Sequence, residues 1–263
     1  MNKLLKIGGV SVTALSAALY ASSVSKTVAE EVTQTSDLKD FTKIELNTSA
    51  DLNISIGDDF SIILTGDDER MEKLVLEISG RTLEIKEEDE RRRWTNWDKD
   101  QKMQIDVTMP DIEAMKINGS GDAIITGVDN EELELKVNGS GDLDVEGRSQ
   151  QMDIGINGSG DIRMDQVAGK DVEVSINGSG DVEINGGTCE NLEIDINGSG
   201  DVEAKELKCV DVDVEVSGSG DSVVFASNSI IFDSSGSGNV DVYGKPETVV
   251  DKEAERRSRI KIR

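Results

Sequence analysis

The sequence contains no histidine, and aromatic side chains make up only 3% of its 263 residues. Histidine is the side chain that most often exchanges a proton near neutral pH, so its absence removes the commonest general base of hydrolytic enzymes. Large aromatic side chains dominate the cores of conventional globular domains. We therefore expect a core of small, mostly β-branched residues that stack repetitively, and no catalysis that depends on an imidazole.

Positive charge is also scarce. The chain has 28 lysines and arginines against 54 aspartates and glutamates, for a formal net charge of −26. Proteins that bind nucleic acids or anionic membranes present positive charge to the phosphates. Neither nucleic acid nor an anionic membrane is therefore an expected partner, whereas the acidic composition favours solubility and contact with cations.

Long apolar runs are missing as well, and the most apolar stretch, residues 7–19, is too short and too polar for a comfortable membrane span. It follows two lysines and precedes small residues, which is typical of an export signal. We predict a signal peptide over residues 1–29, cleaved after Ala29 or Ala21. The alternative is a disordered cytosolic leader. Export predicts a periplasmic, cell-surface or extracellular protein with no membrane span after cleavage.

The dominant feature that is present is an internal repeat. The tetrapeptide Gly-Ser-Gly-Asp occurs six times, and Gly-Ser-Gly-Asn follows once, at steps of 20, 19, 20, 20, 20 and 18 residues. Such a steady step is the signature of a repeat architecture. The copies begin at Gly119, Gly139, Gly158, Gly178, Gly198, Gly218 and Gly236.

Each copy lies between short runs such as "LEIDI" and "DVEI", in which apolar and polar residues alternate. A period of two indicates strands with one buried face. One repeat is too small to bury its own apolar face, so repeats must stack. An antiparallel meander gives no reason for every second turn to be identical, whereas a parallel coil stacks equivalent residues. We therefore predict an all-β parallel solenoid with about 20 residues per coil.

We predict one domain over residues 37–263, with a looser N-terminal part over 37–115 and regular repeats over 116–243. A polar insertion near residues 87–102 contains Trp94 and Trp97 beside three arginines. These tryptophans are a candidate contact patch, because Trp and Arg are favoured binding anchors. The favoured alternative is that they cover the edge of a coil. The basic C-terminal tail is expected to pair as a last strand and to guard the open edge with charge.

Stacking predicts that the residues of the corner form columns. Glycine permits a sharp corner and close approach of stacked backbones. The preceding asparagines are expected to form an amide ladder. The acids of the corner are expected to form a column continued by Asn239. The column comprises Asp122, Asp142, Asp161, Asp181, Asp201 and Asp221; the ladder comprises Asn118, Asn138, Asn157, Asn177 and Asn197.

Neighbouring carboxylates about 4.8 Å apart repel one another by roughly 1 kcal/mol in bulk water. Two arrangements offset this repulsion. Each aspartate accepts hydrogen bonds from the glycine-corner amides, as aspartates do in turns, or Ca²⁺ lies between the coils. We favour hydrogen bonds, because Asn239 can make the same bonds but is a poorer cation ligand. The sequence thus predicts no catalytic, cofactor or metal residues, with calcium as the alternative.

Two cysteines hold the same position in consecutive repeats, because Cys189 and Cys209 each lie nine residues before the next corner glycine. A coil stacks them with Cα atoms about 4.8 Å apart, within the range of a disulfide. Export makes oxidation available. The alternative is a pair of stacked free thiols, because in-register Cβ atoms point in parallel directions.

Several of these segments together resemble a known family. They are "FTKIELN", "VTMPDIEAMKINGSGD", the repeated "INGSGD" and the closing "GSGNVDVYGKP", and the triplet "GIN" occurs at residues 155–157. Over residues 38–263 the chain resembles the head GIN domain family of bacterial auto-transporter adhesin heads. The resemblance implies a right-handed parallel β-helix in an exported protein, and it implies no established activity or catalytic residues.

Three functions are compatible with this sequence. The favoured one is a non-enzymatic, adhesin-like binding or structural module of the cell envelope or surface, with an envelope protein or glycan as partner. The second is an accessory protein in envelope signalling or stress. The third is a carbohydrate-active enzyme, which needs two carboxyl groups with pKa values pushed apart in a cleft. Regularly spaced, solvated carboxylates and serines without a base partner, such as Ser120, argue against the third.

Overall fold

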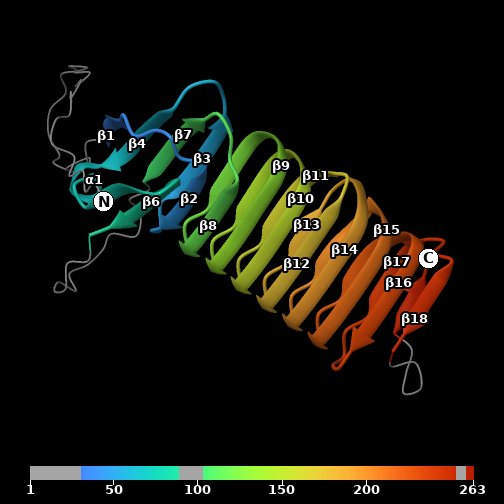
Figure 1. Cartoon of the computed structure of the whole chain (residues 1–263). Coiled ribbons are helices and arrows are strands. Elements are labelled where there is room, and N and C mark those ends of the chain that lie inside the picture. Colours follow the sequence, from blue (N-terminus) through green and yellow to red (C-terminus); the bar gives the residue numbers. More distant parts are fainter. Residues whose placement is uncertain (1–30, 89–102, 253–258) are drawn as a thin grey trace, which may run out of the picture.

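The computed structural model describes residues 31–88, 103–252 and 259–263. Within them nearly every element is a strand, and the strands stack one behind another along an elongated body (Figure 1). The predicted signal peptide, Trp94 and Trp97 lie outside the described residues.

The N-terminal part consists of β1 (Glu31–Ser36), β2 (Lys43–Asn47), β3 (Asp51–Ile56), β4 (Ser61–Asp67), α1 (Asp68–Met71), β5 (Leu74–Ser79), β6 (Thr82–Glu87) and β7 (Gln104–Met109). The stack continues with β8 (Ala114–Gly119), β9 (Ala123–Gly139), β10 (Leu143–Gly158), β11 (Ile162–Ala168), β12 (Asp171–Gly178), β13 (Val182–Ile184) and β14 (Gly187–Gly198). It ends with β15 (Val202–Gly218), β16 (Ser222–Ser234), β17 (Val240–Gly244), β18 (Thr248–Asp251) and β19 (Ile260–Ile262).

From β8 to β19 all pairings are parallel, and equivalent residues of successive repeats lie side by side. The corner glycine Gly178, for example, pairs with Gly158 on one side and with Gly198 on the other. The parallel solenoid predicted from the repeat is therefore confirmed. The basic tail also pairs as predicted, because β19 lies parallel to β17.

The core consists of columns of inward-facing aliphatic residues. Ile156, Ile176, Ile196 and Val216 stack in register, and each has 0% of its surface exposed. Along each strand, inward-facing apolar residues alternate with outward-facing polar residues, so every second position of a strand contributes to one of these core columns. Each coil therefore buries apolar area against both neighbours, which is how repeats too small to fold alone stabilise one another.

The N-terminal part, for which the sequence predicts a looser pattern, contains antiparallel pairs as well as parallel ones. β1 pairs antiparallel with β4, β4 with β7, and β5 with β6, while β2 and β3 join the parallel stack. Strand β1, which precedes residue 37, is among these antiparallel partners. Alternation predicts strands but not their direction, so it did not distinguish these antiparallel pairs from further coils. They close this end of the solenoid.

One core column contains a polar side chain without a hydrogen-bond partner. Ser222 lies between Val202 and Val240 and is 1% exposed, and its hydroxyl has no hydrogen-bond partner among the described residues. We expect Ser222→Val to raise the free energy of unfolding by about 1 kcal/mol, because it removes an unsatisfied buried hydroxyl and adds apolar contact. Urea unfolding measures the change.

Ser149 is the matched control, since it is also fully buried but donates its hydroxyl to the carbonyl of Gln151 at 3.0 Å. Ser149→Val removes a satisfied hydrogen bond, so we expect it to destabilise the protein. Equal effects of the two substitutions would contradict this interpretation of Ser222.

Candidate functional site

The six corner aspartates form a continuous column on one edge of the solenoid. A side-chain oxygen of each accepts a hydrogen bond from the main-chain N–H of the residue one coil further on, at 2.7–2.9 Å. Asn239 ends the column, and both its main-chain and side-chain nitrogens donate to Asp221. The residues of the column are Asp122, Asp142, Asp161, Asp181, Asp201 and Asp221.

The source of these hydrogen bonds differs from the expected one. The donors to the column are not glycine amides of the same corner but the amides of the next residue in the column, as between Asp181 and Asp201. Glycine carbonyls of the corner instead accept from the serine amides of the following coil, as Gly178 does from Ser199. Each carboxylate therefore links two coils, and this bond offsets the repulsion between neighbouring charges.

We expect Asp181→Asn to leave the free energy of unfolding unchanged or to raise it by up to about 1 kcal/mol. The amide oxygen still accepts from the Asp201 N–H, whereas one repelling charge disappears. Asp181→Ala loses the acceptor and is expected to cost about 1 kcal/mol. If both variants lose the same stability in urea unfolding, the negative charge itself is required and this account of the column is wrong.

Metal binding at the column is a separate question. Among the described residues, no group of three or more Cys, Asp or Glu side chains is arranged to hold a metal ion. Because main-chain N–H groups already offset the repulsion within the column, we predict that the melting temperature at constant ionic strength differs by no more than about 2 °C between EDTA and millimolar calcium. A rise of about 10 °C with calcium, absent with matched sodium, would show that the corners bind the ion.

Side-chain amides form a second ladder beside the column. Asn138 donates to Asn118 at 2.8 Å, and Asn157 donates to Asn138 at 2.9 Å. Asn118 itself donates to Asn47, so the ladder extends into the N-terminal part. These bonds hold the corners from Asn47 to Asn157 in register. The ladder differs from the expected one at Asn197, whose amide donates instead to Asp195 on its own strand at 3.5 Å.

The two cysteines lie in the core rather than on the surface. A disulfide joins Cys189 and Cys209, whose Cα atoms are 4.4 Å apart in neighbouring coils. Cys189 is 3% exposed and Cys209 is 0% exposed, so the bond is shielded from solvent. The disulfide links β14 covalently to β15.

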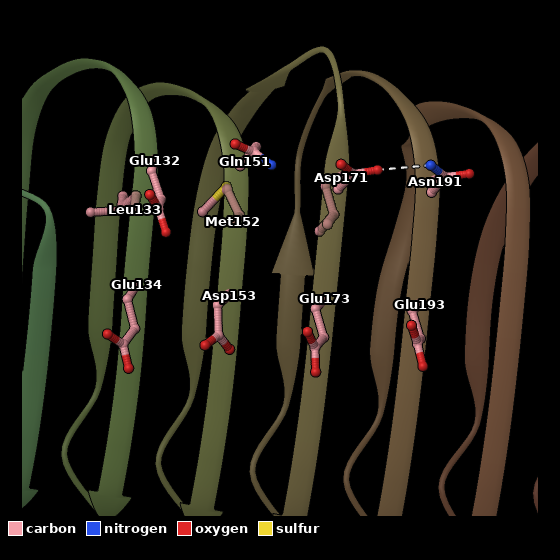
Figure 2. A pocket seen from close by; sticks show the side chains of 11 residues that line it. Glu132, Leu133, Glu134, Gln151, Met152, Asp153, Asp171, Glu173, Asn191 and Glu193 are labelled. Carbon is pink, nitrogen blue, oxygen red and sulfur yellow. Dashed lines mark hydrogen bonds between the residues drawn. The ribbon is translucent and has the colours of Figure 1, made fainter.

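A row of outward-facing acids runs along the middle of one face, and the sequence reasoning did not single it out. Each acid lies five residues before the first glycine of a corner, and the register places the acids side by side. Figure 2 shows four of them pointing outward from neighbouring strands. The acidic row comprises Glu134, Asp153, Glu173, Glu193 and Asp213.

At one end of the acidic row, a lysine of the same chain neutralises two of the acids. The Lys136 ammonium lies 2.6 Å from Glu134 and 3.0 Å from Asp153, and these two carboxylates raise its pKa. Gly155, opposite Lys136 in the register, has no side chain, which leaves room for the lysine to lie across the strand. Among the described residues, Glu173, Glu193 and Asp213 form no ion pair and face solvent.

Four acids of the row, Glu134, Asp153, Glu173 and Glu193, line a shallow groove of about 470 Å³ together with the edges of apolar side chains such as Met152. A second, parallel row borders the groove, in which Asn191 donates to Asp171 at 2.7 Å (Figure 2). A smaller groove of about 230 Å³ lies on the strands after the corner, where Arg163 contacts Asp144 and Glu183. Both grooves are acidic, but the second contains its own cation.

Two carboxyl groups outside the acidic row and outside both grooves have lowered pKa values. Hydrogen bonds from Arg148 lower the pKa of Asp129, and hydrogen bonds from Ser229 and Asn228 lower the pKa of Asp211. A general acid needs a raised pKa, which follows from burial in apolar surroundings or from a close like charge. Asp129 and Asp211 are therefore shifted in the direction opposite to that of a general acid.

Comparisons with known proteins agree with this architecture. The family model "Putative auto-transporter adhesin, head GIN domain" matches residues 40–163 and again residues 145–246. A search of curated proteins found no match. In the parts of the chain that the structure describes, no helix is long and apolar enough to cross a membrane.

Several solved structures share the fold. A "putative lipid binding protein" from Parabacteroides distasonis is 22% identical, with a TM-score of 0.76 over 90% of this chain and 98% of that chain. A "putative adhesin" from the same organism is 19% identical, with a TM-score of 0.77 and the same coverage. A "putative adhesin" from Parabacteroides merdae is 17% identical, with a TM-score of 0.77 over 90% and 97%.

At these identities the solved structures establish the fold alone, whereas the two matches of the family model cover most of the sequence. Together with the corner repeat and the parallel stack, the family match shows that the chain belongs to the head GIN domain family.

Proposed function

We propose that the protein is an exported, non-enzymatic, adhesin-like binding module of the cell envelope or surface, and that its acidic row contacts a cationic partner. The observation that carries the proposal is the exposed, unpaired part of the row, Glu173, Glu193 and Asp213. These three acids continue a periodic array of five that is roughly 19 Å long. A rigid array of like charges attracts and orients a partner of opposite charge.

Export is supported by two features of the chain. Residues 1–29 have the pattern of a signal peptide. The Cys189–Cys209 disulfide suits an oxidising compartment, such as a periplasm or the cell exterior. Family membership agrees with a surface role, because the family is described as one of adhesins.

A non-enzymatic role is supported by the regularity of the surface. Active sites are usually built on irregular loops, whereas successive coils here repeat the same short corners. The chain has no histidine, and the pKa values of Asp129 and Asp211 are lowered rather than raised. The carbohydrate-active alternative predicts release of reducing ends from envelope polysaccharides, and we expect none.

Affinity capture from envelope fractions tests the proposal. The row variant is Glu173→Gln, Glu193→Gln and Asp213→Asn. The control variant is Glu146→Gln, Asp165→Asn and Glu206→Gln, which removes the same charge from exposed acids that form no ion pair among the described residues and that lie on strands after the corner. We expect the wild type and the control to capture the same envelope component and the row variant to capture at least tenfold less.

Two outcomes contradict the proposal. If both variants lose capture equally, net charge matters and the acidic row does not. If the wild type captures nothing and releases reducing ends, the protein is an enzyme. An accessory role in envelope signalling or stress predicts the same capture but a signalling protein as the captured component.

A further inference from the structure

The C-terminal end of the solenoid exposes residues that belong to its core. Val249 stacks on Ile230, which is fully buried, yet Val249 is 47% exposed. Ile262 stacks on Val242, which is also fully buried, and is likewise 47% exposed. Both side chains hold inward-facing positions of the last coil. Their exposure results from the lack of a further coil over them among the described residues.

The main chain is equally open at this end. Within the described residues, β18 pairs with β16 and β19 pairs with β17, and neither has a partner on its outer side. An unpaired strand edge offers N–H and C=O groups to another chain. The opposite end differs, because the antiparallel strands close it and bury Leu74 and Leu76 to 4% and 2% exposure.

Charge also distinguishes this end from the acidic faces. Lys252 lies 3.6 Å from Asp233, and Arg263 pairs with Asp241. Lys261 is exposed beside them, and Arg259 donates to Ser234 at 3.2 Å. A hollow of about 540 Å³ lies here, and it is bordered by Arg259, Lys261 and Arg263 together with Asp221 and Asp241. Positive and negative groups therefore alternate on a surface that also contains apolar side chains.

We propose that the C-terminal end is a homotypic interface, at which two copies of the chain stack end to end around a twofold axis. In this fold the surface that covers one coil is another coil, and the last coil of a second copy has the same outline and the same apolar positions. A twofold contact requires a self-complementary surface. The mixed charges of the end meet this requirement, whereas contact between two acidic faces would set like charges against each other.

This proposal is independent of the partner of the acidic row. An end-to-end dimer leaves both acidic rows accessible and doubles their number, which increases avidity for a polyvalent surface. Loss of the dimer would therefore leave binding by a single copy intact. Failure of either proposal can be recognised without reference to the other.

Sedimentation velocity of the exported full-chain product tests the interface. We expect a dimer at concentrations up to about 100 µM. Val249→Lys with Ile262→Lys is expected to give a monomer. Ile124→Lys with Val210→Lys is the matched control, because these residues are 43% and 41% exposed on other parts of the surface, and we expect it to remain a dimer.

Two further measurements make the result decisive. Circular dichroism and the melting temperature must show that the end variant remains folded. Small-angle scattering of the wild type should give a maximum dimension about twice that of the monomeric variant, as expected for end-to-end stacking. A wild type that is monomeric throughout, or an end variant that stays dimeric, overturns the proposal.

Discussion

Replacement of Gly178 by alanine is expected to lower the free energy of unfolding by about 4 kcal/mol or more. The φ angle of Gly178 is +146°, a conformation that residues with a Cβ rarely adopt, and a Cβ there would lie 2.0 Å from the carbonyl oxygen of Gly158. Backbone strain and overpacking therefore act together, and the two backbones of neighbouring coils have no room to separate without breaking the stack.

Gly169 provides the matched control. Its φ is also positive, at +127°, but no atom lies within 4 Å of a Cβ built on it. Gly169→Ala is therefore expected to cost only the strain, about 1–2 kcal/mol. Urea unfolding of both variants measures the difference. If Gly178→Ala and Gly169→Ala lose the same free energy of unfolding, contact between stacked corners is not what restricts position 178 to glycine.

Loss of the disulfide is the second large expected effect. In the chain-entropy model, a cross-link that closes a loop of 20 residues stabilises the folded state by about 3 kcal/mol. Cys189→Ala and Cys209→Ala are each expected to cost about this amount, since either one breaks the bond. The double substitution is then expected to cost little more than one single substitution.

If the disulfide is present, the stability losses of the two single substitutions therefore do not add up in the double substitution. Two stacked free thiols would instead give smaller losses that add, because each alanine would remove only its own packing. Mass measurement after alkylation without reductant provides an independent check on protein from an oxidising compartment. Two alkylated cysteines in the wild type would contradict the disulfide.

The repeat was the strongest sequence signal, and it predicted the parts of the structure that depend on register. A constant step between the corners, such as Gly158 to Gly178, places equivalent residues side by side. The aspartate column, the amide ladder and the proximity of Cys189 to Cys209 all follow from that one condition. Each requires only that the coils stack in phase.

Other features depend on information that periodicity does not carry. The antiparallel pairing of β5 with β6 follows from a tight turn at Gly80, whose φ is +65°, and alternation alone does not reveal strand direction. The donor to each corner carboxylate depends on the orientation of main-chain amides between coils. The acidic row did have a signal, because an acid recurs five residues before the corner glycine, as at Glu173 and Glu193.

We propose the acidic row as a binding surface rather than a passive solvated face. Binding of an oligolysine peptide to the immobilised full-chain product, measured over a range of salt concentrations, tests it directly. Ion pairing predicts an affinity that falls as salt rises, since salt screens exposed charges. We expect the row variant at Glu173, Glu193 and Asp213 to bind at least tenfold more weakly than both the wild type and the control variant.

The control variant carries the same net charge as the row variant, so it separates local contact from overall charge. We expect the control variant to bind oligolysine with an affinity within twofold of the wild type, and the row variant to bind it at least tenfold more weakly. A row variant that binds oligolysine as tightly as the control would contradict the claim, because the peptide would then respond only to the net charge of the chain.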